Sequence, residues 1–116
     1  MRDHSKLRAF ELADELVLLV YKMTKGFPKE EMFGLTSQMR RCGISVPSNI
    51  VEGCARLTQS EYRRFLEIAY GSLKELHYQF GLALRLGYIQ ETIGEECDSK
   101  ILETEKVLGS LLKAMR

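Results

Sequence analysis

The side chains best suited to chemistry form one polar set on two predicted helices. The set combines hydroxyl, amide and carboxylate groups at helical spacing and comprises Ser45, Asn49, Glu52, Ser72, Glu75 and Gln79. Two carboxylates such as Glu52 and Glu75 can act as general acid and base, but only in a cleft with a nucleophile or a metal. The sequence shows neither, so we expect no catalytic site. We expect instead a buried hydrogen-bonded network that fixes helix register and subunit contact, in which Arg41 pairs with Glu75 or Glu52.

Arginine is the residue type that points most directly to a ligand. Its planar guanidinium donates paired hydrogen bonds to phosphate and stays charged at physiological pH. The candidate contacts for the backbone of RNA or DNA are Arg40, Arg41, Arg56, Arg63 and Arg64. The last three flank a predicted turn and so share one end of the fold, whereas the first two lie about four helical turns away. The alternative is that these side chains are solvated or paired with Glu52, Glu61 and Glu67.

The cysteines and histidines do not predict a metal or cofactor site. Cys42, Cys54 and Cys97 are widely spaced, and none belongs to a C-x-x-C pair. His77 lies next to a helical seam, and His4 belongs to a terminus that we expect to be mobile, so they do not form a metal-binding pair. The cysteines are interpreted as small core residues of a reduced, cytoplasmic protein.

Four helices must position these side chains, and apolar periods of three and four residues mark them. They are predicted to span about 6–25, 30–54, 59–86 and 91–115, with Thr36 as an alternative start of the second helix. Pro47 falls inside the second helix, where a proline removes a backbone hydrogen bond at a cost of roughly 3 kcal/mol and should produce a kink. Thr58 and Glu61 predict a capping box at the start of the third helix, and Gly87 predicts its end.

Bulk properties place these helices in one domain, residues 1–116. Of these residues 45% are hydrophobic, which is enough for a core without disulfides or metals, and no segment alternates as a strand does. Seventeen Lys and Arg oppose sixteen Asp and Glu, so no global field drives binding. We find no signal peptide and no run long enough to cross a membrane. The prediction is an all-α, up-down-up-down antiparallel four-helix bundle.

Four blocks together resemble a known family: LTSQMRR at 35–41, SVPSNIVEG at 45–53, EYRRFLEIAYGSLKEL at 61–76 and LGYI at 86–89. They are similar to the 23S ribosomal RNA intervening-sequence proteins, which are four-helix bundle proteins encoded within insertions in bacterial ribosomal RNA genes and elsewhere in bacterial genomes. The accessory variability determinants of diversity-generating retroelements are similar to this family in fold. The resemblance covers almost the whole chain.

The resemblance implies a homopentamer around a central pore, with a role associated with nucleic acid and no known catalytic chemistry. Three positions depart from the family pattern. Cys42 and Val51 replace the usual alanine and keep the apolar character. His77 stands where glutamate is common, which puts any charge network through that position in doubt.

Two functions follow as alternatives. The first is a non-enzymatic, oligomeric protein that binds the backbone of RNA or DNA and pools weak basic patches into avidity, with a nucleic-acid-processing protein as a candidate partner. The second is an oligomeric scaffold that binds a protein and has no direct nucleic-acid function. Two apolar stripes on the first helix favour the second, because they suggest contact with both its own bundle and a neighbouring subunit.

Overall fold

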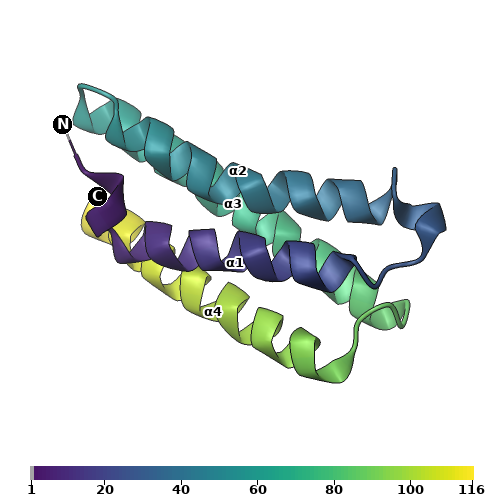
Figure 1. Ribbon diagram of the computed structural model, residues 1–116. Coiled ribbons are helices and arrows are strands. Elements are labelled where there is room, and N and C mark those ends of the chain that lie inside the picture. The colour runs from purple at the N-terminus through teal and green to yellow at the C-terminus, as the bar shows by residue number, and fades with distance from the viewer. Residues whose placement is uncertain (1) are drawn as a thin grey trace.

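The computed structural model describes residues 2–116. Across these residues it contains α-helices and two short 3-10 helices, and it contains no strand. The elements are η1 (His4–Lys6), α1 (Arg8–Thr24), η2 (Lys29–Glu31), α2 (Leu35–Cys54), α3 (Gln59–Arg85) and α4 (Glu91–Ala114). The prediction of an all-helical chain is confirmed (Figure 1).

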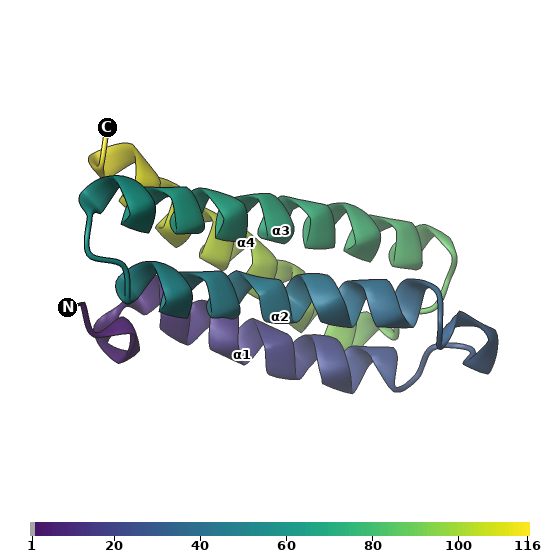
Figure 2. The same cartoon turned by 90° about the horizontal axis from the view of Figure 1, so that it is seen from above.

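Each long helix packs against the two that are next to it around the bundle. Helix α1 contacts α2 and α4, and α3 also contacts α2 and α4. Successive helices run in opposite directions, which confirms the up-down-up-down topology (Figures 1 and 2). The bundle measures 43 × 24 × 21 Å.

The topology creates two ends with different contents. The α2–α3 turn (55–58) and both chain termini gather at one end, which we call the α2–α3 end (Figure 2). The segment between α1 and α2 (25–34) and the α3–α4 turn (86–90) gather at the other, which we call the α3–α4 end. The four-helix order therefore brings segments far apart in sequence to the same place.

The core uses both apolar stripes of α1. Leu12 and Leu16 on one stripe and Val20 on the other are at most 1% exposed. Because α1 packs against α2 and α4, its own bundle accounts for both stripes. Contact of α1 with a neighbouring subunit stays a prediction. Leu18 is the large apolar residue of α1 that remains exposed, at 68%.

Helix α2 begins after a short 3-10 helix and continues through its proline. Of the two expected starts, near Glu30 or Thr36, the later one agrees with the structure, because Lys29–Glu31 form η2 and α2 begins at Leu35. The Glu31 carboxylate accepts a hydrogen bond from the Leu35 backbone N–H at 3.0 Å, which satisfies a donor that has no partner within the helix. Pro47 is buried, and α2 is helical on both of its sides, so the proline does not end the helix.

Both ends of α3 form at the residues that the sequence predicted as its cap and its end. Thr58 Oγ1 accepts a hydrogen bond from the Glu61 backbone N–H at 3.1 Å. The Glu61 carboxylate binds Arg64, so the capping box forms only by this first bond. At the other end Gly87 has a φ of 76°. The N–H of Tyr88 bonds the carbonyl of Ala83 at 3.1 Å, which is the Schellman arrangement of a helix end.

Candidate nucleic-acid interface

A group of arginines lies over two aromatic rings at the α2–α3 end. The Tyr62 and Phe65 rings are 6% and 7% exposed and belong to the first turns of α3. The Arg56 and Arg64 guanidinium carbons each lie 4.6 Å from the Phe65 ring centroid. Arg2 lies over the Tyr62 ring at 3.9 Å. Three segments of the chain therefore supply cations to one aromatic surface, and the rings restrict where those cations lie.

Arg2 is fixed to this surface by the chain itself. Its Nη1 donates to the Arg56 carbonyl at 3.1 Å, and its Nη2 donates to Gln59 Oε1 at 2.9 Å. The N-terminal segment expected to be mobile thus contacts the α2–α3 turn, and residues His4–Lys6 form η1. The His4 ring packs edge-on against Phe10, with centroids 4.7 Å apart.

Each arginine near the turn has a glutamate next to it, as the alternative interpretation expected. Arg56 Nη2 lies 3.2 Å from Glu52 Oε1. Arg64 Nε lies 3.0 Å from Glu61 Oε2, and that hydrogen bond lowers the pKa of Glu61. Arg63 Nε is 3.9 Å from Glu67 Oε2. These pairs are solvent-exposed, and such pairs contribute about 0–1 kcal/mol, so a phosphate can compete with the carboxylates.

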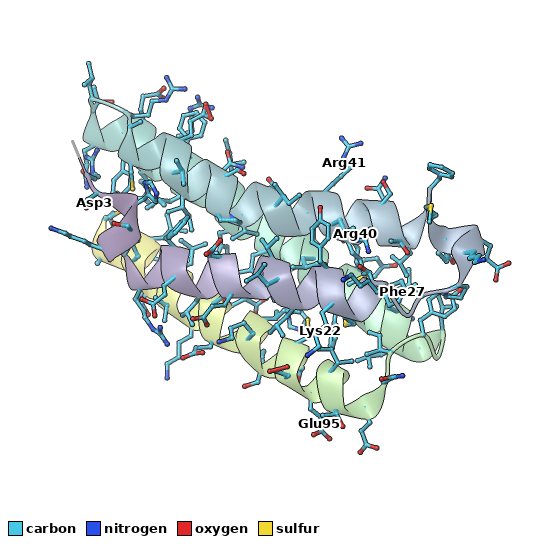
Figure 3. The ribbon with its side chains drawn as sticks, viewed as in Figure 1. Asp3, Lys22, Phe27, Arg40, Arg41 and Glu95 are labelled. Carbon is cyan, nitrogen blue, oxygen red and sulfur yellow. The ribbon has the colours of Figure 1, made fainter. Side chains whose placement is uncertain are left out.

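Arg40 and Arg41 do not belong to this surface. Arg40 is partly buried, and its Nε donates to Thr24 Oγ1 at 2.9 Å while its guanidinium lies 4.7 Å from the Tyr21 ring centroid. It connects α2 to α1, so its role as a free phosphate contact is not favoured. Arg41 is exposed and extends away from the bundle (Figure 3).

The hydroxyl and amide side chains of the polar set meet between α2 and α3, as expected for a network that fixes helix register. The Ser45 and Ser72 hydroxyl oxygens lie 2.8 Å apart. Asn49 Nδ2 donates to the Ser45 carbonyl at 2.8 Å and to its hydroxyl at 3.0 Å. Gln79 Nε2 donates to Cys42 Sγ at 3.4 Å, and Gln79 Oε1 is buried without a partner among the described residues. The hydroxyls and amides therefore fix the register of these two helices.

The carboxylates of the set are not part of this network. Glu52 pairs with Arg56, and no ion pair joins Arg41 to Glu52 or Glu75 within residues 2–116. The expected pairing of Arg41 is therefore wrong within the chain. Arg41 and Glu75 instead line a groove of about 260 Å³, whose lining residues are Gln38, Arg41, Cys42, Ser45, Ser72 and Glu75. Glu52 lies outside that groove, so the structure does not bring the two carboxylates together as an acid and base.

The cysteines and His77 lie in surroundings that indicate structural roles. All three cysteines are free and buried, and burial raises the pKa of Cys97 to about 12. Burial also raises the thiol pKa of Cys42 and Cys54. His77 Nδ1 lies 2.8 Å from Glu105 Oε2 on α4, so the residue that departs from the family pattern has an acidic partner.

Two further kinds of site are absent from residues 2–116, namely a metal site and a membrane-spanning helix. No group of three or more histidine, cysteine or acidic side chains in the part of the chain that the structure describes is arranged to hold a metal. No helix between residues 2 and 116 combines the length and the apolar character that crossing a membrane requires.

Sequence reasoning missed three cations at the α2–α3 end. Arg2 belongs to the N-terminus, and Lys113 and Arg116 lie at the C-terminal end of α4, where they line a cavity with Arg63. Motif reading did not select them, because each is an isolated cation near a terminus. The predicted topology could have identified these cations, because an antiparallel bundle of four helices places both termini beside its second turn.

Comparisons with known proteins agree with this architecture. A family model described as 23S rRNA-intervening sequence protein matches residues 5–110. The crystal structure of a protein with unknown function from the S23 ribosomal protein family of Bacteroides thetaiotaomicron VPI-5482 superimposes with a TM-score of 0.80. The identity is 24%, and the match covers 90% of this chain and 98% of that one, so it supports the fold alone. No curated protein matches the sequence.

Proposed function

The chain belongs to the 23S rRNA-intervening sequence protein family, and we propose that it is a non-enzymatic, oligomeric protein that binds the backbone of RNA or DNA through its α2–α3 end. The observation that carries the proposal is the aromatic surface of Tyr62 and Phe65, over which Arg2, Arg56 and Arg64 lie. Guanidinium groups held in place lose less freedom on binding a phosphate than flexible cations do.

The charge balance favours backbone contact over reading of base sequence. The net charge of the chain is +1, so attraction to nucleic acid must come from a local cluster. The rings under the arginines are buried and therefore are not available to stack on bases. Phosphate contacts of this kind position a nucleic acid without selecting its sequence.

The test is a comparison of the two ends of the bundle. Fluorescence anisotropy would measure affinity for a structured RNA and for duplex DNA from low to physiological salt. The variant R56A/R63A/R64A should lose at least about tenfold in affinity and should show a shallower salt dependence. The matched control K22A/K25A/K29A removes the same charge from exposed lysines of the α3–α4 half and should change affinity less than about twofold. Absence of wild-type binding at low salt would refute the proposal.

We further propose that α2 and α3 form the contact between copies, in the pentameric arrangement that the family resemblance implies. Apolar side chains on the outer surface of this helix pair are solvent-exposed, and they are Ile44 (42%), Val51 (36%), Ile68 (40%) and Tyr78 (64%). Arg41 and Glu75 lie among them as exposed groups of opposite charge. An Arg41 on one copy can pair with a Glu75 on the next, which is a head-to-tail contact of the kind that closes rings.

Charge reversal tests this contact. Measurement of mass in solution should show an oligomer for the wild type, and R41E and E75R should each shift it toward the monomer. The double variant R41E/E75R should restore assembly, because the pair is rebuilt with its charges exchanged. A wild-type monomer at all concentrations, or no effect of either reversal, would refute this contact. The variant I68E tests the apolar part and should also dissociate the assembly.

The scaffold function remains the second candidate, and a specific surface favours it. Phe33 is 94% exposed and Met32 is 57% exposed in the segment that precedes α2. Apolar side chains so exposed often contact a protein. If one stoichiometric protein is recovered with the wild type, resists nuclease and is lost with F33S but kept with R56A/R63A/R64A, the scaffold function is favoured over nucleic-acid binding.

A further inference from the structure

A cavity between α3 and α4 lies next to the arginine surface and has a different lining. Its volume is about 290 Å³, and its lining residues are Arg63, Tyr70, Gly109, Leu112, Lys113 and Arg116. Three of these six side chains are cationic and none is acidic. The cavity therefore has the charge that a phosphate group requires, in a concave site.

The cations of this cavity are not neutralised by the chain. Lys113 and Arg116 have no ion-pair partner within residues 2–116. The carboxylate near Arg63 belongs to Glu67, which is 57% exposed and stands 3.9 Å from Arg63 Nε. An incoming anion would thus meet two cations that have no side-chain carboxylate paired with them and a third whose glutamate partner is exposed and 3.9 Å away.

The polar groups of the cavity are also positioned. Arg63 Nη1 donates to the Met115 carbonyl at 2.9 Å, which holds the guanidinium of α3 against the end of α4. The Tyr70 hydroxyl makes no hydrogen bond to any residue that the structure describes, so its O–H is available as a donor. The Tyr70 ring packs close to Gly109, where a Cβ would lie 3.5 Å from Tyr70 Cε2, an ordinary van der Waals contact.

We propose that this cavity binds one phosphate group of a nucleic acid, with Arg63, Lys113 and Arg116 facing its oxygens and Tyr70 donating a hydrogen bond. This inference rests on the proposed function, since the cavity adjoins the surface to which the nucleic acid would bind. A terminal phosphomonoester and an internal phosphodiester share the chemistry that such a site recognises. Charge-assisted hydrogen bonds to phosphate from arginine and lysine supply the binding energy.

Small phosphates test the cavity without nucleic acid. Amide resonances of the ¹⁵N-labelled full chain would be followed during titration with inorganic phosphate, methyl phosphate and dimethyl phosphate. Resonances of residues 70, 109 and 113 should shift with saturation. The variant K113Q should weaken binding about tenfold and Y70F about threefold. The control K29Q, which removes one exposed lysine at the α3–α4 end, should leave the affinity unchanged.

The two phosphate probes separate the sources. If methyl phosphate binds more tightly than dimethyl phosphate, the cavity accepts a terminal phosphate, and an RNA with a 5′-phosphate should bind more tightly than the same RNA with a 5′-hydroxyl. Equal affinities assign the cavity to the internal backbone. No saturable shift with any probe, or equal effects of K113Q and K29Q, would overturn the proposal.

Failure here is distinguishable from failure of the proposed function. If R56A/R64A, which leaves Arg63 of the cavity in place, abolishes RNA binding while no phosphate binds at residues 70, 109 and 113, the arginine surface is supported and the cavity is refuted. If phosphate binds in the cavity while RNA does not bind at low salt, the cavity is supported and the nucleic-acid function is refuted. Circular dichroism of Y70F and K113Q ensures that a loss of binding is not a loss of folding.

Discussion

The two ends of the bundle both carry cations, but they hold them differently. At the α2–α3 end, arginines lie on buried aromatic rings, and Arg2 is tied by hydrogen bonds to the turn. At the α3–α4 end, a cavity of about 300 Å³ is lined by the cations Lys25, Lys29 and Arg40, by two threonines and by apolar side chains that include Phe27 and Met32. Beside that cavity Phe33 is 94% exposed. Leu57 in the α2–α3 turn is exposed to a similar extent, at 93%, so exposed apolar surface does not separate the two ends. They differ in the number of arginines that lie over aromatic rings, which is three at the α2–α3 end and one, Arg40, near the other.

Charge number alone therefore does not locate a binding surface in this chain. Arginine over an aromatic ring keeps its orientation and can still donate to a phosphate, since guanidinium has five N–H groups. Exposed lysine retains its rotamer freedom and loses more of it on binding. The cavity at the α3–α4 end has many apolar lining residues, so it suits a protein side chain better than a phosphate backbone. The comparison thus supports our proposal that nucleic acid binds at the α2–α3 end, and it favours the other end for the alternative proposal of protein contact.

Replacing glycine by alanine should affect the packing of the two ends unequally, and this is the largest effect we predict. A Cβ at Gly53 would lie 3.0 Å from Phe65 Cβ and 3.2 Å from the Tyr62 carbonyl oxygen. Because that oxygen is backbone, the helices must move apart, and G53A should lower the free energy of unfolding by about 2 kcal/mol. Gly53 is thus the position where α3 approaches α2 closely.

Gly94 is the matched position at the α3–α4 end. A Cβ there would meet Ile89 Cγ2 at 2.9 Å, but Ile89 is a partly exposed side chain in a turn and can move. Alanine also favours helix over glycine by about 1 kcal/mol, so G94A should change stability by less than about 1 kcal/mol. Urea unfolding of both variants tests this contrast, and equal losses would contradict the tight packing assigned to the α2–α3 end.

Arg2, in the N-terminal segment, offers a sharper test of the arginine surface. The variant R2A removes a cation from the Tyr62 ring without disturbing the core, so RNA affinity at low salt should fall about fivefold. Unfolding should change by less than about 0.5 kcal/mol. K29A removes one positive charge from the other end and should leave the affinity within experimental error. Anisotropy titrations of the two variants would show whether Arg2 belongs to the surface, and equal affinities would exclude it.

The smallest predicted effect is a loss of local stability at low pH at the α3–α4 end. The Leu35 N–H and the Tyr88 hydroxyl both donate to the Glu31 carboxylate and lower its pKa below the usual 4.5. A lowered pKa contributes stability that is present above the unfolded-state value and is lost as pH falls through the folded-state value. Hydrogen-exchange protection of the Leu35 amide should therefore decrease below about pH 4.5. E31Q should remove this pH dependence; unchanged protection of the wild type at pH 3 would contradict the assignment.

Much of the fold was predictable because local signals and global packing agree. The Thr58 cap and the Gly87 end both form, since each depends on a few neighbouring residues. The meeting of Ser45 and Ser72 was also predictable, because helical spacing placed matching polar stripes on consecutive antiparallel helices. The start of α2 was predictable only as two alternatives, because the choice depends on the Glu31 carboxylate reaching the Leu35 amide rather than on apolar periodicity.

The candidate site was predictable only in part. Arg56 and Arg64 could be assigned to one end because they flank a turn, but Arg2 could not be recognised before the bundle brought the N-terminus to that turn. Arg40 was selected by residue type, although its contact with Thr24 depends on how α1 and α2 pack. Pairing of Arg41 with Glu75 was expected from sequence, yet the structure places both on an exposed groove without a bond. Charged contacts thus depend on side-chain positions that periodicity does not fix.

Mapping the bound nucleic acid on the protein is the most direct test of the account. Amide resonances of the ¹⁵N-labelled chain would be followed during titration with a structured RNA at low salt. If nucleic acid binds at the α2–α3 end, the shifted residues should cluster at 2–6, 54–65 and 109–116, with little change over 25–36. Shifts concentrated in 25–36 and 86–90, with the α2–α3 end unchanged, would contradict it.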